Sequence, residues 1–163
     1  MNLSRKELKL PHNDNSNSDC TLYTIGFAKK SAKQFFTLLK DNGVKTLIDV
    51  RLNNVSQLAG FTKKKDLHYF LKEICDINYD HRPEFAPTKE ILDAYKKKEI
   101  SWSDYESKYN SVLIERSVAK QITSEELNMA CLLCSEPTAE KCHRRLLAEA
   151  FKKHYGDINI KHI

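Results

Sequence analysis

The sequence has no apolar run that approaches the roughly twenty residues of a membrane-spanning helix. Its N-terminus, MNLSRKELKLPHNDNSNSDC, also lacks the apolar segment of a secretory signal peptide. We therefore expect a cytoplasmic protein without membrane contact. The five cysteines are an odd number in a chain without an export signal, which favours thiols over a disulfide framework.

Positive charge is only slightly in excess of negative charge, with 27 Lys and Arg against 22 Asp and Glu. The net charge of +5 permits an anionic partner without requiring one, and the lysine runs 63–65 and 96–98 are typical of solvated helix faces. With 40% hydrophobic residues in 163, the composition is that of one folded domain. We expect a mobile leader over 1–19, where Asn, Ser and Asp leave little to bury, and a single domain over 20–163.

Strand and helix patterns alternate along the chain. TLYTI (21–25) predicts a strand, and SAKQFFTLLKDNG (31–43) predicts a helix with capping-box spacing at Ser31 and Gln34. VKTLIDV (44–50) is almost continuously apolar, as in strands buried on both faces of a parallel sheet. Further patterns predict helices over 64–75, 89–98 and 138–155, a helix after Ser101 whose aromatic stripe belongs to the core, a strand or extended loop at 77–81, a strand over 128–134, and an edge strand in DINIKHI. The predicted fold class is α/β, a single domain with a mostly parallel open sheet and helices on both faces.

Ligands of open parallel sheets bind outside the carboxyl ends of the strands. Arg51, at the end of LIDVR, is predicted to hold an anion there, with Asp49 orienting the guanidinium. The alternative is that Asp49 and Arg51 form a purely structural pair. Tyr79 and His81, at the next strand end, either complete the pocket wall or belong to ordinary loop packing.

The segment CLLCSEPTAEKCHRR (131–145) has the densest set of reactive side chains. A zinc knuckle needs a tight turn between Cys131 and Cys134, whereas the intervening leucines predict a strand, where residues three apart point to opposite faces. Cys134, Cys142 and His143 would then be the only ligands left, and neighbours on a helix diverge by about 100°. We therefore expect no metal and no other cofactor.

Thiol chemistry is a different interpretation of the same segment. Cys142, at a helix N-terminus, and Cys134, at a strand end, are candidate reactive cysteines because a helix dipole and nearby arginines stabilise a thiolate. LIDVR followed by a strand that ends in cysteine resembles rhodaneses and cysteine phosphatases. However, SEPTAEKCHR contains no glycine and places Arg144 ten residues after Cys134, so the glycine-rich anion loop of those enzymes is lacking.

Proton transfer and anion binding are further roles for this segment. Glu136, two residues beyond the strand end, is a candidate general acid or base, and His143 either assists it or caps the helix. Arg144 lies near a helix N-terminus, where a cation opposes the dipole unless an anion such as a ligand phosphate accompanies it.

Five segments together resemble the family described as domain of unknown function 488: TIGF (24–27), LIDVR (47–51), INYDHRPEF (77–85), WSDYESKYNSVL (102–113) and LLCSEPTAEKCHRRLLAEAF (132–151). The resemblance implies a small cytoplasmic α/β protein and an enzyme without an established reaction. It marks seven positions, namely Asp49, Arg51, Cys134, Glu136, Cys142, His143 and Arg144. The chain departs from the family pattern at Phe27 and Ala28, where His and Ser are common, and Glu84 to Pro87 replaces a glycine-rich segment.

The leading hypothesis is an enzyme that binds a phosphate-bearing ligand, either a nucleotide or a nucleic acid, through Arg51 and Arg144. Glu136 would transfer the proton with the help of His143, and Cys134 and Cys142 would shape the pocket or react. One alternative is a thiol-dependent enzyme, and another is a non-catalytic nucleic-acid-binding module that uses the lysine runs.

Overall fold

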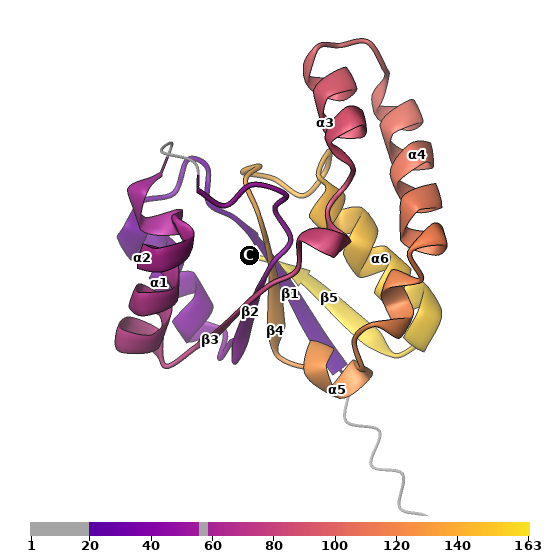
Figure 1. Cartoon of the computed structure of the whole chain (residues 1–163). Helices are drawn as coiled ribbons and strands as arrows, with labels where there is room; N and C mark the ends of the chain where they lie inside the picture. Colours follow the sequence, from indigo (N-terminus) through magenta and orange to yellow (C-terminus); the bar gives the residue numbers. More distant parts are fainter. Residues whose placement is uncertain (1–19, 56–58) are drawn as a thin grey trace, which may run out of the picture.

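A computed structural model describes residues 20–55 and 59–163, so the leader expected over 1–19 lies outside the described residues. Within them, five strands form one parallel sheet in the order β3-β2-β4-β1-β5 (Figure 1). The strands are β1 (Cys20–Gly26), β2 (Thr46–Asp49), β3 (Asn78–His81), β4 (Ala130–Cys134) and β5 (Ile158–His162). The fold is therefore α/β with a parallel sheet, and DINIKHI supplies an edge strand as predicted.

Helices cover both faces of the sheet. They are α1 (Ala32–Asp41), α2 (Lys64–Phe70), α3 (Lys89–Lys96), α4 (Trp102–Glu115), the short α5 (Ser124–Leu127) and α6 (His143–Tyr155), with a π-helical turn over Leu71–Cys75. One apolar cluster joins α1 and α2 to the sheet, and a second joins α3, α4 and α6 to its other face (Figure 1). The predicted arrangement of helices on both faces is confirmed.

The central strand β4 explains this layering, because its side chains alternate between the two clusters. Leu132 packs with α6, whereas Cys131 and Leu133 pack with α1 and α2. All five residues of β4 are buried. A strand covered on both faces needs apolar residues at every position, and the ACLLC sequence of β4 supplies them.

The helix predicted over 138–155 begins later, at His143. Residues 135–141 instead form a loop that is tied to the end of β1, because the Ala28 N–H donates to the Ser135 carbonyl at 3.0 Å. Cys142 therefore becomes the N-cap of α6, with an extended backbone (φ −139°, ψ 138°). The predicted start of the helix at residue 138 was wrong, whereas Cys142 lies at the helix N-terminus as expected.

Helices α3 and α4 form a hairpin that rises beyond the carboxyl edge of the sheet (Figure 1). Ser101 caps α4 in a capping box with Asp104, as its spacing predicts, and Thr88 caps α3. The hairpin therefore stands beside the edge where ligands of such sheets bind. None of the helices in the described part of the chain is both long and apolar enough to span a membrane.

Candidate active site

A cavity of about 840 Å³ lies between the carboxyl ends of the strands and the α3–α4 hairpin. Its floor comes from the ends of β2 and β4 and from the start of α6, through Arg51, Cys134, Cys142 and His143. Its outer wall comes from α3 and α4. The cavity thus lies where the rule for open parallel sheets predicts a ligand.

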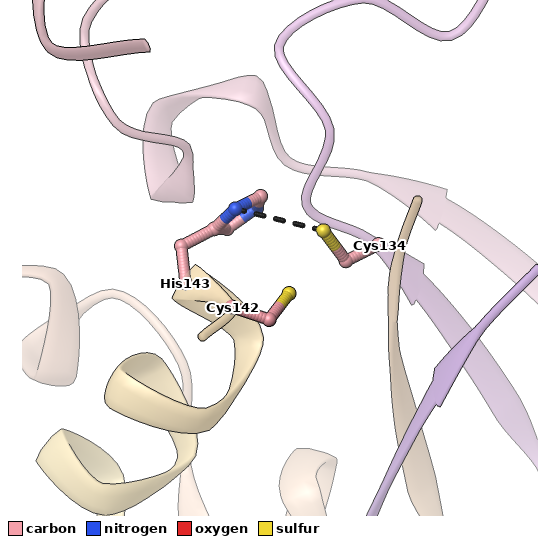
Figure 2. Close-up of side chains that lie close together, drawn as sticks. All are labelled: Cys134, Cys142 and His143. Carbon is pink, nitrogen blue, oxygen red and sulfur yellow. Dashed lines mark hydrogen bonds between the residues drawn. The ribbon is translucent and has the colours of Figure 1, made fainter. Parts of the chain in front are cut away.

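Cys134 and His143 meet on the floor of this cavity (Figure 2). The Cys134 sulfur lies 3.5 Å from His143 Nδ1, while His143 Nε2 lies 3.0 Å from the Val50 carbonyl oxygen. Because a carbonyl only accepts, Nε2 carries the proton and Nδ1 presents its lone pair to the sulfur. The imidazole is thereby oriented from β2 to accept a proton from the thiol on β4.

Cys142 brings a second sulfur to the same place. The two sulfurs and one imidazole nitrogen of Cys134, Cys142 and His143 all lie within 4.8 Å of one another. The expected divergence of Cys142 and His143 was wrong, because Cys142 has an extended backbone ahead of the first turn of the helix. Figure 2 shows both side chains pointing from the head of α6 toward Cys134.

Arg144 runs behind the cluster and is 1% exposed. Its guanidinium donates to the Glu136 carbonyl at 2.7 Å, to the Cys142 sulfur at 3.3 Å and to the Thr24 hydroxyl at 3.3 Å. Among the described residues, none of the ion pairs includes Arg144. A buried guanidinium without a carboxylate is costly, and the sulfur atoms are the groups beside it that can carry negative charge.

This environment shifts the pKa values of the two thiols, Cys134 and Cys142, in opposite directions. Burial alone would raise the pKa of Cys134, but hydrogen bonding from the Cys142 thiol and from the Glu136 backbone outweighs it. With the Arg144 charge adding to these effects, the pKa of Cys134 lies below that of an ordinary thiol. The hydrogen bond to Cys134, together with burial, raises the pKa of Cys142. Cys134 is therefore the thiol favoured as thiolate, and burial lowers the pKa of His143, which keeps the imidazole neutral at neutral pH.

A second polar network lies at the ends of β2 and β3. Arg51 binds Asp49 in a bidentate ion pair, at 2.8 Å through Nε and 2.7 Å through a terminal nitrogen, and also donates to the Thr62 carbonyl at 2.8 Å. The Tyr79 hydroxyl donates to the second Asp49 oxygen at 2.7 Å and accepts from Asn54 at 3.0 Å. Burial, with the charge of Asp49, raises the pKa of Tyr79, so its hydroxyl stays protonated.

The structure divides the predicted site residues between these two networks. Cys134, Cys142, His143 and Arg144 form one, and Asp49, Arg51 and Tyr79 form the other. His81 lies beside the second network, with its ring Nε2 3.0 Å from the Arg51 carbonyl. Glu136 borders the cavity, but its side chain is exposed, and only its backbone carbonyl contacts Arg144.

Several residues of the site were not predicted from the sequence. The Val50 carbonyl and the Thr24 hydroxyl have no pattern of their own, since each acts only through a partner distant in sequence. Gly26 had a usable signal, because a scarce glycine at a strand end often marks a close approach of two backbones. A Cβ on Gly26 would lie 1.6 Å from the Glu136 carbonyl oxygen, which is the acceptor for Arg144.

The sequence analysis also did not place the residues of the cavity wall at the site. Lys96 and Lys98, from a run predicted to be solvated, border the cavity together with Lys89 and Lys141. Trp102, from the aromatic stripe assigned to the core, packs against the core cluster but is half-buried and also borders the cavity. Tyr95, which lies outside that stripe, borders the cavity as well, with its ring 5.7 Å from that of Trp102. That assignment is confirmed for Tyr105 and Tyr109, which are buried.

A family model described as "Domain of unknown function DUF488" matches residues 31–151. This match spans the ends of β2, β3 and β4 and most of α6, and therefore both polar networks. No curated protein and no solved structure matches the chain.

Proposed function

Because the chain belongs to the domain of unknown function 488 family, whose description names no activity, we propose a function from the geometry of the site. The protein is a cytoplasmic, thiol-dependent enzyme that acts on a phosphate-bearing small molecule. Cys134 is the nucleophile, and His143 is its general base. The observation that carries the proposal is the position of the His143 ring between the Cys134 sulfur and the Val50 carbonyl.

The three groups have the arrangement that nucleophilic catalysis by cysteine needs. A base lies within reach of the nucleophile, and a third group fixes the tautomer and direction of the base. Val50 is itself held in place, because its N–H donates to the Leu133 carbonyl at 3.2 Å. Cys134 therefore ends the central strand β4 and His143 begins helix α6, while the carbonyl that orients the His143 ring follows the neighbouring strand β2.

The cavity above the dyad supports an anionic ligand. Four lysines border it, at positions 89, 96, 98 and 141, against two carboxylates at 93 and 136. Lys89 is paired with Asp93, so the other three lysines give the cavity a positive potential. A phosphate is the anion that such a cluster of amines commonly binds.

The aromatic wall supports a ligand that also has a flat group. Trp102 and Tyr105 stack at 4.9 Å, and Tyr95 lies against both rings. A cavity of about 840 Å³ has the size of small-molecule sites. A mononucleotide meets both requirements, and an oligonucleotide held by one terminal nucleotide is the form of nucleic-acid binding that the cavity could accept.

This proposal favours the thiol-dependent alternative over the hypothesis centred on Glu136. A general acid or base gains its tuned pKa from a desolvated position, whereas the Glu136 side chain is exposed. Arg51 is already paired with Asp49, and Arg144 lies behind the thiols. Anion binding is accordingly assigned to the lysines of the cavity wall.

The first test is the rate at which iodoacetamide alkylates each cysteine at neutral pH, followed by peptide mass spectrometry. Cys75 is the internal reference, because it is half-buried and burial raises its thiol pKa. We expect Cys134 to react faster than Cys75 despite its deeper burial, and His143→Gln to slow Cys134 without affecting Cys75. Equal rates at Cys134 and Cys75, or a rate at Cys134 that His143→Gln leaves unchanged, would contradict the dyad.

The second test measures protection of Cys134 by adenosine 5′-monophosphate, with adenosine as the control that lacks phosphate. We expect the nucleotide to slow alkylation of Cys134, and the protection to be lost in the double variant Lys96→Ala/Lys98→Ala. Equal protection by adenosine would contradict the assignment of a phosphate-bearing ligand. Protection by a labelled oligonucleotide alone would favour the nucleic-acid-binding module.

A further inference from the structure

We propose that Cys134, Cys142 and His143 form a binding site for one thiophilic metal ion, with Zn(II) as the reference ion. Two sulfurs and one imidazole nitrogen are the donor set of sites that keep one coordination position open. The metal-binding part of this inference is independent of the proposed function. Its consequence for reactivity rests on that function, because the ion would bind the nucleophile itself.

The distances fit a tetrahedral ion. Zinc lies about 2.3 Å from a cysteine sulfur and about 2.0 Å from a histidine nitrogen, so a sulfur and a nitrogen ligand lie about 3.5 Å apart. The Cys134 sulfur and His143 Nδ1 are 3.5 Å apart. The Cys142 sulfur is within 4.8 Å of both atoms, and a small rotation of its side chain would bring it to the ligand distance.

The tautomer of His143 also suits a metal ligand. Histidines that bind metal commonly donate the other ring N–H to a backbone carbonyl or a carboxylate, which fixes the ring. His143 has this arrangement, with Nε2 at 3.0 Å from the Val50 carbonyl and Nδ1 directed at the sulfur of Cys134. The outer contact that a metal site needs is therefore present without the metal.

The surrounding charge favours thiolate ligands. Arg144 donates to the Cys142 sulfur and lacks a carboxylate partner among the described residues. Two thiolates balance the charge of Zn(II), and an anionic fourth ligand would balance Arg144. All three ligand residues border the cavity, so the fourth position faces the place proposed for a phosphate-bearing molecule.

Metal binding and nucleophilic attack by Cys134 exclude each other, because both use the same sulfur and the same nitrogen lone pair. An ion held by the three residues would therefore switch off the thiol, and its removal would restore it. Cys142 distinguishes the metal site from the catalytic dyad. Binding of the ion needs Cys142, whereas His143 takes part in both the metal site and the dyad.

The experiment titrates Co(II), and then Zn(II), into the full-length protein under reducing conditions without chelator. We expect one equivalent of cobalt to give the visible bands of a tetrahedral ion and a thiolate charge-transfer band, and zinc to displace it. Cys142→Ser and Cys134→Ser should weaken zinc binding by more than the roughly 10- to 100-fold that loss of an outer contact costs. Cys75→Ser is the matched control and should bind as the wild type does, with circular dichroism reporting the fold of every variant.

Cobalt spectra that are not tetrahedral, or binding that persists in Cys142→Ser, would overturn the metal site. Alkylation of Cys134 with and without one equivalent of zinc completes the test, and we expect zinc to block it and a chelator to restore it. Rapid alkylation of the metal-free protein with no metal binding would overturn the metal site and leave the proposed function intact. Tetrahedral metal binding with slow alkylation of the metal-free protein would overturn the proposed function and leave the metal site intact.

Discussion

Arg51 and Arg144 are both buried arginines near the carboxyl edge of the sheet, but their surroundings differ. Arg51 is 4% exposed and is held by both oxygens of Asp49, which is itself fully buried. Arg144 is 1% exposed and contacts a carbonyl, a hydroxyl and a thiol. The first guanidinium has its counter-charge within the fold, and the second has polar partners but no carboxylate partner among the residues that the structure describes.

The difference separates a structural site from a chemical one. A closed ion pair such as Asp49–Arg51 has little capacity left for a ligand, and it positions the ends of β2 and β3. An uncompensated guanidinium stabilises negative charge wherever it arises nearby, and the nearest candidates are the thiols of Cys134 and Cys142. The two arginines should therefore respond differently to the same substitution.

Arg51→Met is expected to have the largest effect on stability. It leaves the buried Asp49 carboxylate with only the Tyr79 hydroxyl and a backbone N–H, and breaking a buried pair from one side costs about 3–5 kcal/mol. Urea denaturation would measure the loss. Lys72→Met is the control, because its pair with Asp76 is at the surface, where such pairs contribute little to stability. Equal losses in the two variants would mean that the buried pair is no more important than a surface one.

Gly26→Ala is expected to cost about 3 kcal/mol, the upper part of the range for overpacking. The new Cβ would lie 1.6 Å from the Glu136 carbonyl oxygen and 2.9 Å from an Arg144 nitrogen, so the 135–141 loop has to move. The same denaturation measurement applies, and alkylation of Cys134 should slow as well. Gly60→Ala is the control, because its Cβ would meet nothing within 4 Å. An unchanged stability in Gly26→Ala would show that the loop is not held against β1.

Arg144→Met is expected to cost less stability than Arg51→Met, about 1–2 kcal/mol, because it leaves a carbonyl without a donor but no carboxylate without a partner. Its main effect should fall on chemistry. Loss of the Arg144 charge, which helps to lower the pKa of Cys134, should raise that pKa and reduce the thiolate fraction at neutral pH, so alkylation of Cys134 should slow severalfold. If Arg144→Met loses as much stability as Arg51→Met and Cys134 keeps its alkylation rate, Arg144 is a structural residue like Arg51 and does not stabilise the thiolate.

The fold could be predicted largely from local patterns. The continuous apolar character of VKTLIDV predicted a strand covered on both faces, and the capping residues Ser31 and Ser101 predicted two helix starts. These features depend on neighbours in sequence, so a single chain displays them. The start of α6 was predicted five residues early, because the contact that holds the loop comes from Ala28, just after β1 and more than 100 residues away in sequence.

The site shows the same limit. The sequence brought Cys134, Cys142, His143 and Arg144 to one edge of the sheet, since strand ends and helix starts meet there. It could not show that Val50 fixes the His143 tautomer, or that an extended N-cap turns Cys142 toward Cys134. Both facts depend on backbone geometry at single residues, which no residue type encodes.

Glu136→Gln is expected to have the smallest effect and bears most directly on the roles within the site. Its side chain is exposed and Arg144 contacts only its backbone carbonyl, so stability should change by less than about 0.5 kcal/mol. Alkylation of Cys134 should stay within about twofold of the wild type, because the proton passes to His143 rather than to the carboxylate. If Glu136→Gln slows alkylation as much as His143→Gln does, the carboxylate takes part in deprotonating the thiol, and the site works with a base on each side of Cys134.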